Sequence, residues 1–369
     1  MNPSYSKQYL VVCTLRIGDV LLTTPVIRAI READPAARID VMVLSGMEGI
    51  LEGNPDIDQI RIVPHRAGFF ARVREMFSLW RRYDIALTTV SSDRARWYCF
   101  IAGKSSAGLY NPHSAWLSTR LLGKRLVFDD LHTHTVSMGL KVLDLLDLPK
   151  QFRVIPPTAG GAIPAVLEQK PYVVLHPFPK FSYKMWPSGN WISLACELTL
   201  QGVQVVLTGG PDAEERQYVD AIARASQAIN LCGTLTLAQT ADLLSRATLF
   251  VGPDTGVTHL AASVGIPTVA LFGPSNPVKW GPWPSSHAHD ESPWRMKGSQ
   301  QAGNVSLIQG EGECVPCREE GCDKNRSSHS RCLDELSVST VMRAIDRVRA
   351  ASSGQSQVPA PAGGANLPR

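Results

Sequence analysis

The feature that most constrains this chain is a regular alternation between short apolar segments and longer segments with helical periodicity. The apolar segments are rich in β-branched side chains, as in YLVVCT at residues 9–14, which is typical of strands buried on both faces. In the N-terminal part they predict strands at residues 9–14, 39–44, 59–63 and 85–90. Strands that alternate with helices form parallel, doubly wound sheets, so the predicted fold class is α/β.

A second series of the same kind follows a break in this alternation. Residues 151–170 are rich in Pro, Gly and Ala and predict a linker. The segments beyond it predict strands at 172–176, 203–208, 228–231, 249–251 and 268–272, and helices at 189–200, 212–225, 237–245 and 255–264. The sequence therefore predicts two Rossmann-like domains, at residues 1–150 and 171–336.

The C-terminal end divides into two segments of different character. Residues 337–350 have the periodicity of an amphipathic helix. Residues 351–369 are poor in large apolar side chains and rich in Ser, Gly, Pro and Ala. A segment of that composition cannot bury enough apolar surface to fold, so we expect a disordered tail.

The composition is that of a chain with large apolar cores and no membrane-spanning segment. Of its 369 residues, 44% are hydrophobic and 19% are charged, a balance found in soluble globular proteins. No apolar run approaches the roughly 18–20 residues that a membrane helix requires, and the N-terminus lacks the pattern of a signal peptide. We therefore expect a cytoplasmic protein whose eight cysteines are mostly thiols or metal ligands.

The positive charge is concentrated in the N-terminal half. Residues 1–150 hold 19 Lys and Arg against 15 Asp and Glu, whereas residues 151–369 hold 18 of each. An excess of this kind favours an anionic partner, such as lipid headgroups, a phosphorylated glycan or nucleic acid, although a solvated basic face is the simpler interpretation. Nucleic acid is disfavoured because no aromatic or helical readout element accompanies the basic residues.

A carboxylate follows the first predicted strand directly, in the segment LRIGD at residues 15–19. Ligands of open α/β sheets bind beyond the carboxyl ends of the strands, so Asp19 is a candidate catalytic residue. The alternative is that Asp19 only caps the helix that follows. A dinucleotide site is disfavoured, because the G-x-G-x-x-G pattern is missing and only Gly18 occupies this turn.

The most specific motif is VGPDTGVTHLAA at residues 251–262, where a strand, a Gly-Pro turn and a helix start follow one another. Amides at such a helix start can bind phosphate, which makes Thr255 and Gly256 candidate diphosphate ligands. Asp254 repels phosphate and is better suited to sugar hydroxyls. The alternative is a capped helix with His259 packed on its face.

Two further loops contribute candidate ligands for a nucleotide. Lys184 lies between the first strand and the first helix of the second domain, where an ammonium can neutralise a diphosphate, although an exposed loop lysine is the commoner fate. Glu214 and Glu215 follow the turn Gly209-Gly210, where an acidic residue often binds ribose hydroxyls. The sequence does not decide between them, and favourable charge at a helix start is the alternative for both.

A cysteine cluster lies near the C-terminal end of the second domain. Cys314, Cys317, Cys322 and Cys332 are dense enough for a tetrahedral zinc site. Their spacing is not that of a standard ribbon or finger, so buried or redox-active thiols are the alternative. The hypothesis is a structural zinc.

Taken together, these segments resemble glycosyltransferase family 9, the heptosyltransferases of lipopolysaccharide core assembly. The resemblance lies in RIGDVLLTTPVIRAIR at residues 16–31, in DTGVTHLAASVGIPTVALFGPSNP at 254–277, and in the late CVPC…C…CL run followed by a helix. It implies a GT-B fold, in which two Rossmann-like domains face each other across a cleft and the last helix returns to the first domain. It also implies inverting transfer from a nucleotide-diphospho-sugar, with ADP-heptose the first candidate, and no cofactor for catalysis.

The resemblance also implies roles for individual residues. Asp19 matches the catalytic base, Lys184 the diphosphate-binding lysine, and Asp254 the residue that contacts the donor sugar; Thr255, Gly256 and His259 fall in the same donor loop. The N-terminal domain would bind an anionic glycolipid acceptor. Phe178 and Pro179 depart from the pattern, since relatives have small residues there. A different GT-B nucleotide-sugar enzyme, such as an epimerase, and a non-catalytic sugar-nucleotide-binding protein are the alternatives.

One segment of the N-terminal domain has the composition of a membrane-surface helix. Residues 66–82, RAGFFARVREMFSLWRR, interleave large aromatic side chains with arginines that include Arg72, Arg74, Arg81 and Arg82. A basic amphipathic helix can lie in a membrane interface, which predicts weak peripheral contact with the inner face of the cytoplasmic membrane. The alternative is that the aromatic side chains pack into the N-terminal core.

Overall fold

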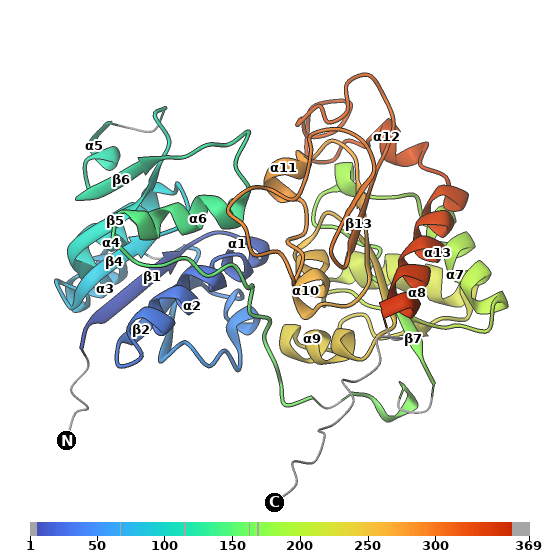
Figure 1. Ribbon diagram of the computed structural model, residues 1–369, viewed down its shortest axis with the longest axis horizontal. Coiled ribbons are helices and arrows are strands. Elements are labelled where there is room, and N and C mark those ends of the chain that lie inside the picture. The colour runs from blue at the N-terminus through green and yellow to red at the C-terminus, as the bar shows by residue number, and fades with distance from the viewer. Residues whose placement is uncertain (1–5, 67, 114–115, 162, 168–169, 356–369) are drawn as a thin grey trace, which may run out of the picture.

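The computed structural model describes residues 6–66, 68–113, 116–161, 163–167 and 170–355, arranged as two α/β domains side by side (Figure 1). Each domain is built on one sheet with helices on both faces, as the sequence predicts. No helix among the described residues is both long enough and apolar enough to cross a membrane.

The N-terminal domain has a parallel sheet of strand order β3-β2-β1-β4-β5-β6. Its described elements are β1 (Gln8–Cys13), α1 (Ile17–Leu21), α2 (Thr24–Ala33), β2 (Arg38–Leu44), η1 (Glu48–Leu51), β3 (Gln59–Val63), α3 (Phe69–Ser78), β4 (Tyr83–Thr88), α4 (Asp93–Ala102), β5 (Gly103–Tyr110), α5 (Trp116–Thr119), β6 (Lys124–Val127) and α6 (Thr135–Asp144). Because β1 lies between β2 and β4, its apolar side chains are covered on both faces, and Leu10, Val11 and Val12 are fully buried.

The C-terminal domain has the sheet order β12-β13-β11-β10-β7-β8-β9, with only β12 antiparallel within the described sheet. Its described elements are η2 (Ala165–Leu167), β7 (Tyr172–Leu175), η3 (Ser182–Lys184), α7 (Ser188–Leu200), β8 (Gln204–Leu207), α8 (Ala213–Ser226), β9 (Ile229–Asn230), α9 (Leu237–Ser245), β10 (Leu249–Pro253), α10 (Gly256–Val264), β11 (Thr268–Phe272), α11 (Pro277–Trp280), β12 (Gln300–Ala302), β13 (Val305–Gln309), α12 (Arg331–Asp334) and α13 (Val338–Gln355).

In both sheets the strand order reverses beside the first strand of the domain. The reversal falls between β1 and β4 in the first sheet and between β7 and β10 in the second. The crevice beyond the carboxyl ends of the strands at such a switch point is where open α/β sheets bind their ligands. The loops that follow β1, β7 and β10 are therefore the expected ligand-binding positions.

The last helix corrects one prediction. The sequence resemblance implied that residues 337–350 return to the N-terminal domain, but α13 packs on α7, β11 and β13 of the C-terminal domain. Its apolar side chains, such as Val341 and Ile345, join the core that holds Trp186 and Trp191. The Trp186 indole N–H also donates to the carbonyl of Leu336 at 2.8 Å, which fixes the start of the helix. Since α13 extends to Gln355, the predicted tail begins later than residue 351, and residues 356–369 lie outside the described chain.

The linker is bonded to both domains. The backbone N–H of Ile155 donates to Thr24 Oγ1 at 2.9 Å in the first domain, and the Thr158 hydroxyl donates to Asp242 Oδ1 at 2.8 Å in the second. One apolar cluster runs continuously through the interface, and it includes Trp283 of the second domain. These contacts hold the two switch points facing each other.

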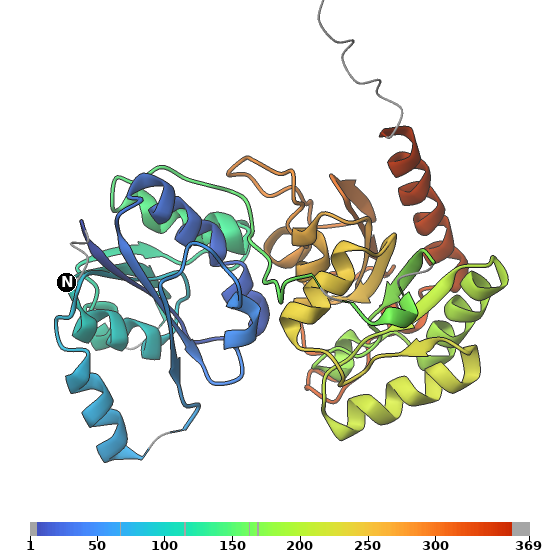
Figure 2. The same cartoon turned by 90° about the horizontal axis from the view of Figure 1, so that it is seen from below.

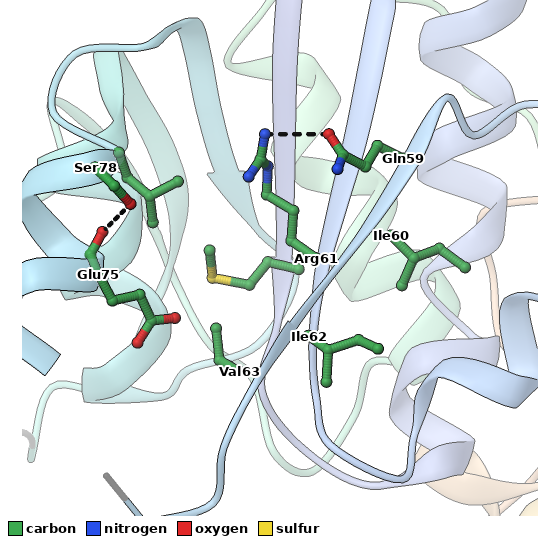
Figure 3. A pocket seen from close by; sticks show the side chains of 9 residues that line it. Gln59, Ile60, Arg61, Ile62, Val63, Glu75 and Ser78 are labelled. Carbon is green, nitrogen blue, oxygen red and sulfur yellow. Dashed lines mark hydrogen bonds between the residues drawn. The ribbon is translucent and has the colours of Figure 1, made fainter. Parts of the chain in front are cut away.

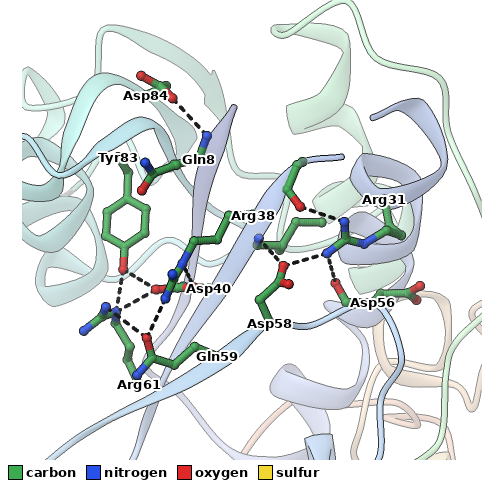
Figure 4. Close-up of polar contacts among 12 residues, drawn as sticks. Gln8, Arg31, Arg38, Asp40, Asp56, Asp58, Gln59, Arg61, Tyr83 and Asp84 are labelled. Atoms are coloured by element: carbon green, nitrogen blue, oxygen red, sulfur yellow. Dashed lines mark hydrogen bonds and ion pairs between the residues drawn. The ribbon is translucent and has the colours of Figure 1, made fainter. Parts of the chain in front are cut away.

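The opposite, amino-terminal ends of the first sheet are fixed by a buried polar network (Figure 4). The fully buried Asp40 carboxylate accepts hydrogen bonds from Arg38 Nε at 3.0 Å, Arg61 Nε at 3.0 Å and the Tyr83 hydroxyl at 2.6 Å. These residues lie among the first three residues of β2, β3 and β4. The network aligns the strands and is not part of the switch-point crevice.

Candidate functional site

The candidate site lies where the first turns of α1 and α10 meet between the domains (Figure 1). Two glycines allow this close approach. A Cβ atom added at Gly18 would lie 3.7 Å from His259 Cδ2 and 3.8 Å from Gly256 Cα, and one added at Gly256 would lie 3.3 Å from Ile17 Cγ2. The loops after β1 and β10, each at a switch point, are therefore in direct contact across the two domains.

Asp19 is the third residue of α1, and its side chain is buried between the domains. One carboxylate oxygen accepts the backbone N–H of Arg16 at 3.2 Å, so the residue does cap the helix. Burial raises the pKa of Asp19, while the Arg16 amide and the charges of Arg16 and Lys279 oppose that rise. A carboxylate with a raised pKa beside a crevice is suited to accept a proton, so capping and base chemistry are compatible here.

Lys184 and Asp254 form a buried ion pair across the second switch point. Lys184 Nζ lies 2.5 Å from Asp254 Oδ2, and their side chains are 18% and 7% exposed. Burial works against ionisation of Asp254, but the charge of Lys184 and hydrogen bonds from Lys184 and Ser275 outweigh it and lower its pKa. The two residues that the sequence assigned to different parts of a donor therefore form one ion pair.

The loop at residues 254–259 is organised by its own side chains. Thr255 caps α10 by accepting the backbone N–H of Thr258 at 3.3 Å. His259 is buried, and this burial lowers its pKa to about 4, so the ring is neutral near pH 7. Its Nδ1 has no hydrogen-bond partner among the described residues, which leaves a buried polar atom free for a ligand.

The structure places Glu214 and Glu215 in different environments. Glu214 is exposed on the first turn of α8, whereas Glu215 is half-buried under the turn that follows β8. A Cβ added at Gly210 would lie 2.8 Å from Glu215 Oε2. Burial raises the pKa of Glu215, and the Gly210 amide lowers it. Of the two glutamates, only Glu215 faces the turn at the carboxyl end of β8.

The four clustered cysteines do not form a metal-ligand set in this structure. Among the residues that the structure describes, no three or more His, Cys, Asp or Glu side chains are placed to hold a metal ion. Burial raises the pKa of Cys332 to about 11, and the charges of Cys317, Cys322 and Cys314 add to this. The loop packs on the donor side through the Ser330 hydroxyl, which donates to the carbonyl of Tyr183 at 2.6 Å.

Sequence reasoning missed two residues that face the site from the domain interface. Lys279 on α11 is buried, and its charge acts on Asp19. Arg16 lies 4.8 Å from the ring centroid of Phe181, in the loop that follows β7. The available signals were a lysine two residues after GPSNP and an aromatic residue three residues before Lys184, but only the docked domains show their partners.

A separate cavity of about 300 Å³ lies beside the edge strand β3 and under α3 (Figure 3). Its lining is mixed, with Gln59, Arg61, Glu75 and Ser78 as polar members beside apolar side chains. It has no part in the switch-point crevice, so it is not the candidate active site.

The basic aromatic segment forms α3 and the turn after it, at the outer edge of the N-terminal domain (Figure 2). Phe70, Phe77 and Trp80 are 85%, 74% and 58% exposed, so these three do not pack into the core. Arg74, Arg81 and Arg82 are exposed as well. Arg81 also donates to the carbonyl of Gly103 at 2.7 Å, and the side chain of Arg72 lies outside the described part of the chain.

Comparison with known proteins gives the family. The model of glycosyltransferase family 9 (heptosyltransferase) matches residues 78–301. Lipopolysaccharide heptosyltransferase 3 of Escherichia coli (strain K12) is 29% identical over 294 residues, which cover 72% of this chain and 82% of that relative.

Solved structures give the fold. A glycosyl transferase family 9 protein from Veillonella parvula DSM 2008 has a TM-score of 0.73 at 18% identity, covering 95% of this chain and 99% of that one. An E. coli ADP-heptose lps heptosyltransferase II has a TM-score of 0.71 at 20% identity, covering 94% and 99%. The predicted GT-B arrangement of two Rossmann-like domains is confirmed. Since the family model also covers more than half of the sequence, the chain belongs to glycosyltransferase family 9 and is a glycosyltransferase.

Proposed function

We propose that this enzyme transfers heptose from ADP-heptose to an anionic lipopolysaccharide-core acceptor, with inversion at the anomeric carbon. The observation that carries the proposal is the position of Asp19, a buried carboxylate with a raised pKa at the first switch point. The residue before it, Gly18, lies against Gly256 and His259 across the domain interface. The heptosyltransferases among its relatives point to the sugar and the acceptor.

In the proposed reaction an acceptor hydroxyl attacks the anomeric carbon of the donor. The new glycosidic C–O bond forms as the bond to the diphosphate oxygen breaks, and Asp19 takes the hydroxyl proton. ADP leaves with the bonding electron pair. Attack from the face opposite the leaving group inverts the anomeric configuration. The step is balanced by these groups and needs no cofactor.

The donor loops supply the remaining roles. Lys184 neutralises the diphosphate as charge develops on the leaving group, assisted by the amides of Thr255 and Gly256 at the start of α10. Asp254, held by Lys184 at 2.5 Å, accepts hydrogen bonds from donor sugar hydroxyls, with His259 beside it. Glu215 binds the ribose, because it is the acidic residue turned toward the end of β8.

We further propose that the α3 edge contacts the inner face of the cytoplasmic membrane. Exposed Phe70, Phe77 and Trp80 next to Arg74 and Arg82 combine apolar surface with positive charge, which is how interfacial helices bind anionic bilayers. Such contact would bring the N-terminal domain to a lipid-anchored acceptor.

A structural zinc at the cysteine cluster is a separate proposal with no catalytic role. Soft thiolate donors suit zinc, and a bound cation would offset the burial and the neighbouring thiolate charges that raise the pKa of Cys332. Binding requires the four thiols to converge further than they do in this structure. Purified protein should then carry about one zinc per chain, and chelation should lower its melting temperature. Metal-free protein with four freely titrating thiols would rule the zinc out.

The function is tested by a donor screen on the purified chain. We expect mass spectrometry to find one heptose added to a heptose-deficient, delipidated core acceptor with ADP-heptose, and nuclear magnetic resonance to find the inverted linkage. Transfer only from another nucleotide sugar would assign a different donor. Conversion of a nucleotide sugar without an acceptor would indicate an epimerase, and binding without turnover a non-catalytic protein.

A further inference from the structure

A second carboxylate lies beside the first switch point, at the start of α4. The strand order reverses between β1 and β4, so the loop after β4 borders the same crevice as the loop after β1. Asp93 is the first residue of α4. Because helical side chains lean toward the amino terminus of their helix, a side chain in this first turn projects beyond the carboxyl ends of the strands. The Asp93 side chain is 59% exposed, and the proposed transfer reaction does not use it.

The loop between β4 and α4 is bonded to the segment that carries Asp19. The hydroxyls of Thr23 and Thr89 lie 2.7 Å apart, and the Thr23 hydroxyl donates to the carbonyl of Asp19 at 2.9 Å. The hydroxyls of Thr14, directly after β1, and Ser92, directly before α4, lie 3.5 Å apart. These contacts hold the starts of α1 and α4 side by side at one edge of the sheet.

The orientation of Asp93 is fixed by a buried arginine. Arg96 lies three residues further along α4 and is fully buried, and its Nη2 pairs with Asp93 Oδ1. The Ser118 hydroxyl accepts from Arg96 Nη2 at 3.1 Å and donates to the same Asp93 oxygen at 2.8 Å. No described residue donates a hydrogen bond to the other oxygen, Oδ2. The carboxylate is therefore held by one oxygen and offers the other to the crevice.

This arrangement differs from a helix cap and from an ordinary surface ion pair. The bonds to Asp93 Oδ1 come from side chains and not from amides of α4. Burying a guanidinium is costly, and among the described residues Asp93 is the one carboxylate that pairs with Arg96. The Arg96 Nη1 lies 3.5 Å from the carbonyl of Leu109 near the end of β5. The guanidinium thus orients a single carboxylate at the carboxyl edge of the sheet.

We propose that Asp93 binds the acceptor: its outer carboxylate oxygen accepts hydrogen bonds from neutral sugar hydroxyls next to the hydroxyl that attacks the donor. The proposal rests on the proposed transfer at Asp19. A fixed carboxylate is a strong acceptor for hydroxyl protons, and it repels a phosphate or carboxylate group at the same position. The site therefore selects an acceptor whose neighbouring hydroxyls are unmodified, although the acceptor as a whole is anionic. Arg96 and Ser118 act through Asp93, as positioning residues.

The test is the initial rate of heptosyl transfer at saturating ADP-heptose, with the delipidated core acceptor varied. Asp93→Ala should lower kcat/KM for the acceptor about 10–100-fold, mainly through KM, because a binding contact is lost while the base remains. Asp93→Asn keeps a neutral oxygen and should lose less. With an acceptor that carries a phosphate beside the attacked hydroxyl the order should reverse, and Asp93→Asn should use that acceptor better than wild type does.

Two further variants separate acceptor binding from packing. Asp84→Asn is the matched control, since Asp84 pairs with Lys104 at 2.9 Å near the opposite end of β4, and it should treat both acceptors as wild type does. Ser118→Ala should raise the acceptor KM in the wild-type background but not in Asp93→Ala, because it acts through that carboxylate. Calorimetry should find unchanged binding of ADP-heptose in every variant.

Three outcomes would overturn the proposal. If Asp93→Ala lowers only the melting temperature, the carboxylate is structural. If it lowers kcat and leaves KM unchanged, the residue acts on the chemistry and not on acceptor binding. If Asp93→Asn gains nothing with the phosphorylated acceptor, the selection against charge is wrong. Calorimetry with the delipidated acceptor separates these results from failure of the proposed function. A wild-type enzyme that neither binds nor extends this acceptor refutes both, whereas one that extends it but binds it no more tightly than Asp93→Ala refutes only this inference.

Discussion

Two aspartates follow interior strands of the two sheets, and they show how partners rather than burial set the chemistry of a site. Asp19 after β1 and Asp254 after β10 are almost equally buried, at 9% and 8% exposed. The pKa of Asp19 is raised by burial, whereas that of Asp254 is lowered because Lys184 lies 2.5 Å from its carboxylate. Paired groups with pKa values displaced in opposite directions mark separate acid–base roles. One carboxylate is suited to accept a proton and the other to stay ionised.

The largest effect on activity is expected from changing Asp19. Replacing it by Asn removes the base but keeps an oxygen that can accept the Arg16 amide, so the fold and donor binding should persist. Turnover should fall by roughly 10²–10⁴-fold, measured as initial rates of heptosyl transfer. A variant that turns over like wild type and is only slightly less stable would show that Asp19 is a helix cap and nothing more.

The next largest effect is expected from changing the Lys184–Asp254 ion pair. Lys184→Ala should weaken binding of ADP by about 10–100-fold, because a charge-assisted contact is lost and the Asp254 carboxylate is left facing the phosphates. Asp254→Ala should impair binding of intact ADP-heptose while largely sparing ADP. Isothermal titration calorimetry with both ligands distinguishes the two.

Lys180, which is exposed in the same loop, provides the matched control for Lys184. Lys180→Ala should bind both ligands like wild type, since its ammonium is solvated. Equal losses for both ligands in both ion-pair variants would mean that the pair acts only as a structural unit. The division into diphosphate and sugar contacts would then be wrong.

The sequence predicted most of the fold because the parallel strands of this protein are apolar and short. The strands at 59–63 and 268–272 and the helix at 237–245 have the bounds expected from pattern alone. Strand β5, GKSSAGLY, escaped prediction because it has no apolar run. Its pairing with β4 decides its conformation, and Gly108 lies so close to Thr88 that a Cβ would meet its side chain at 2.5 Å.

The sequence could predict those site residues that follow a predicted strand directly or lie in the loop after it. Asp19 and Asp254 follow strands, and Lys184 lies in the loop between a strand and a helix, so the sequence could nominate all three. It could not pair Lys184 with Asp254, decide between Glu214 and Glu215, or find Lys279. Each of those depends on contacts between segments far apart in the chain. The segment after the first strand forms two helices, α1 and α2, for a local reason: Pro25 lies in the first turn of α2, where a proline is tolerated and a continuing helix is not.

Buried histidines near both switch points also predict that the folded protein loses stability at acidic pH, because burial keeps their rings neutral. Burial lowers the pKa of His134 to about 3, and those of His176 and His259 to about 4. The unfolded chain binds a proton at each below about pH 6.5, whereas the folded protein does not until these lower values. Stability is therefore complete above pH 6.5 and is lost as the pH falls toward 4, by up to about 1.4 kcal/mol per histidine and pH unit.

Thermal unfolding between pH 7.5 and 4.5 measures this slope. His134→Asn can still cap α6, so it should lower the melting temperature at neutral pH but flatten its decline on acidification. His132→Asn, at an exposed neighbour, should leave the curve unchanged. Parallel curves for wild type and His134→Asn would show that this histidine does not contribute to acid unfolding.

The smallest expected effect concerns the outer edges of the two domains. Of the large apolar side chains exposed in the described chain, eight lie in the N-terminal domain and only Leu200 lies in the other. Phe70, Phe77 and Trp80 on and beside α3 are the most exposed of the eight. If this edge binds a bilayer, replacing all three by Ser should reduce co-sedimentation with anionic vesicles, while stability and turnover on a delipidated acceptor stay close to wild type.

The arginines beside these rings separate the charge contribution from the apolar one. Arg74→Gln and Arg82→Gln should each weaken vesicle binding roughly fivefold, since a basic residue near an anionic surface contributes about 1 kcal/mol. Arg81 is left in place because it holds the carbonyl of Gly103. Raising the salt to 1 M shortens the screening length to about 3 Å and should mimic the arginine changes but not the aromatic ones. Leu200→Ser removes an equally exposed side chain from the other domain and should have no effect. If it weakens binding as much as the aromatic variant does, the membrane contact is not specific to the acceptor domain.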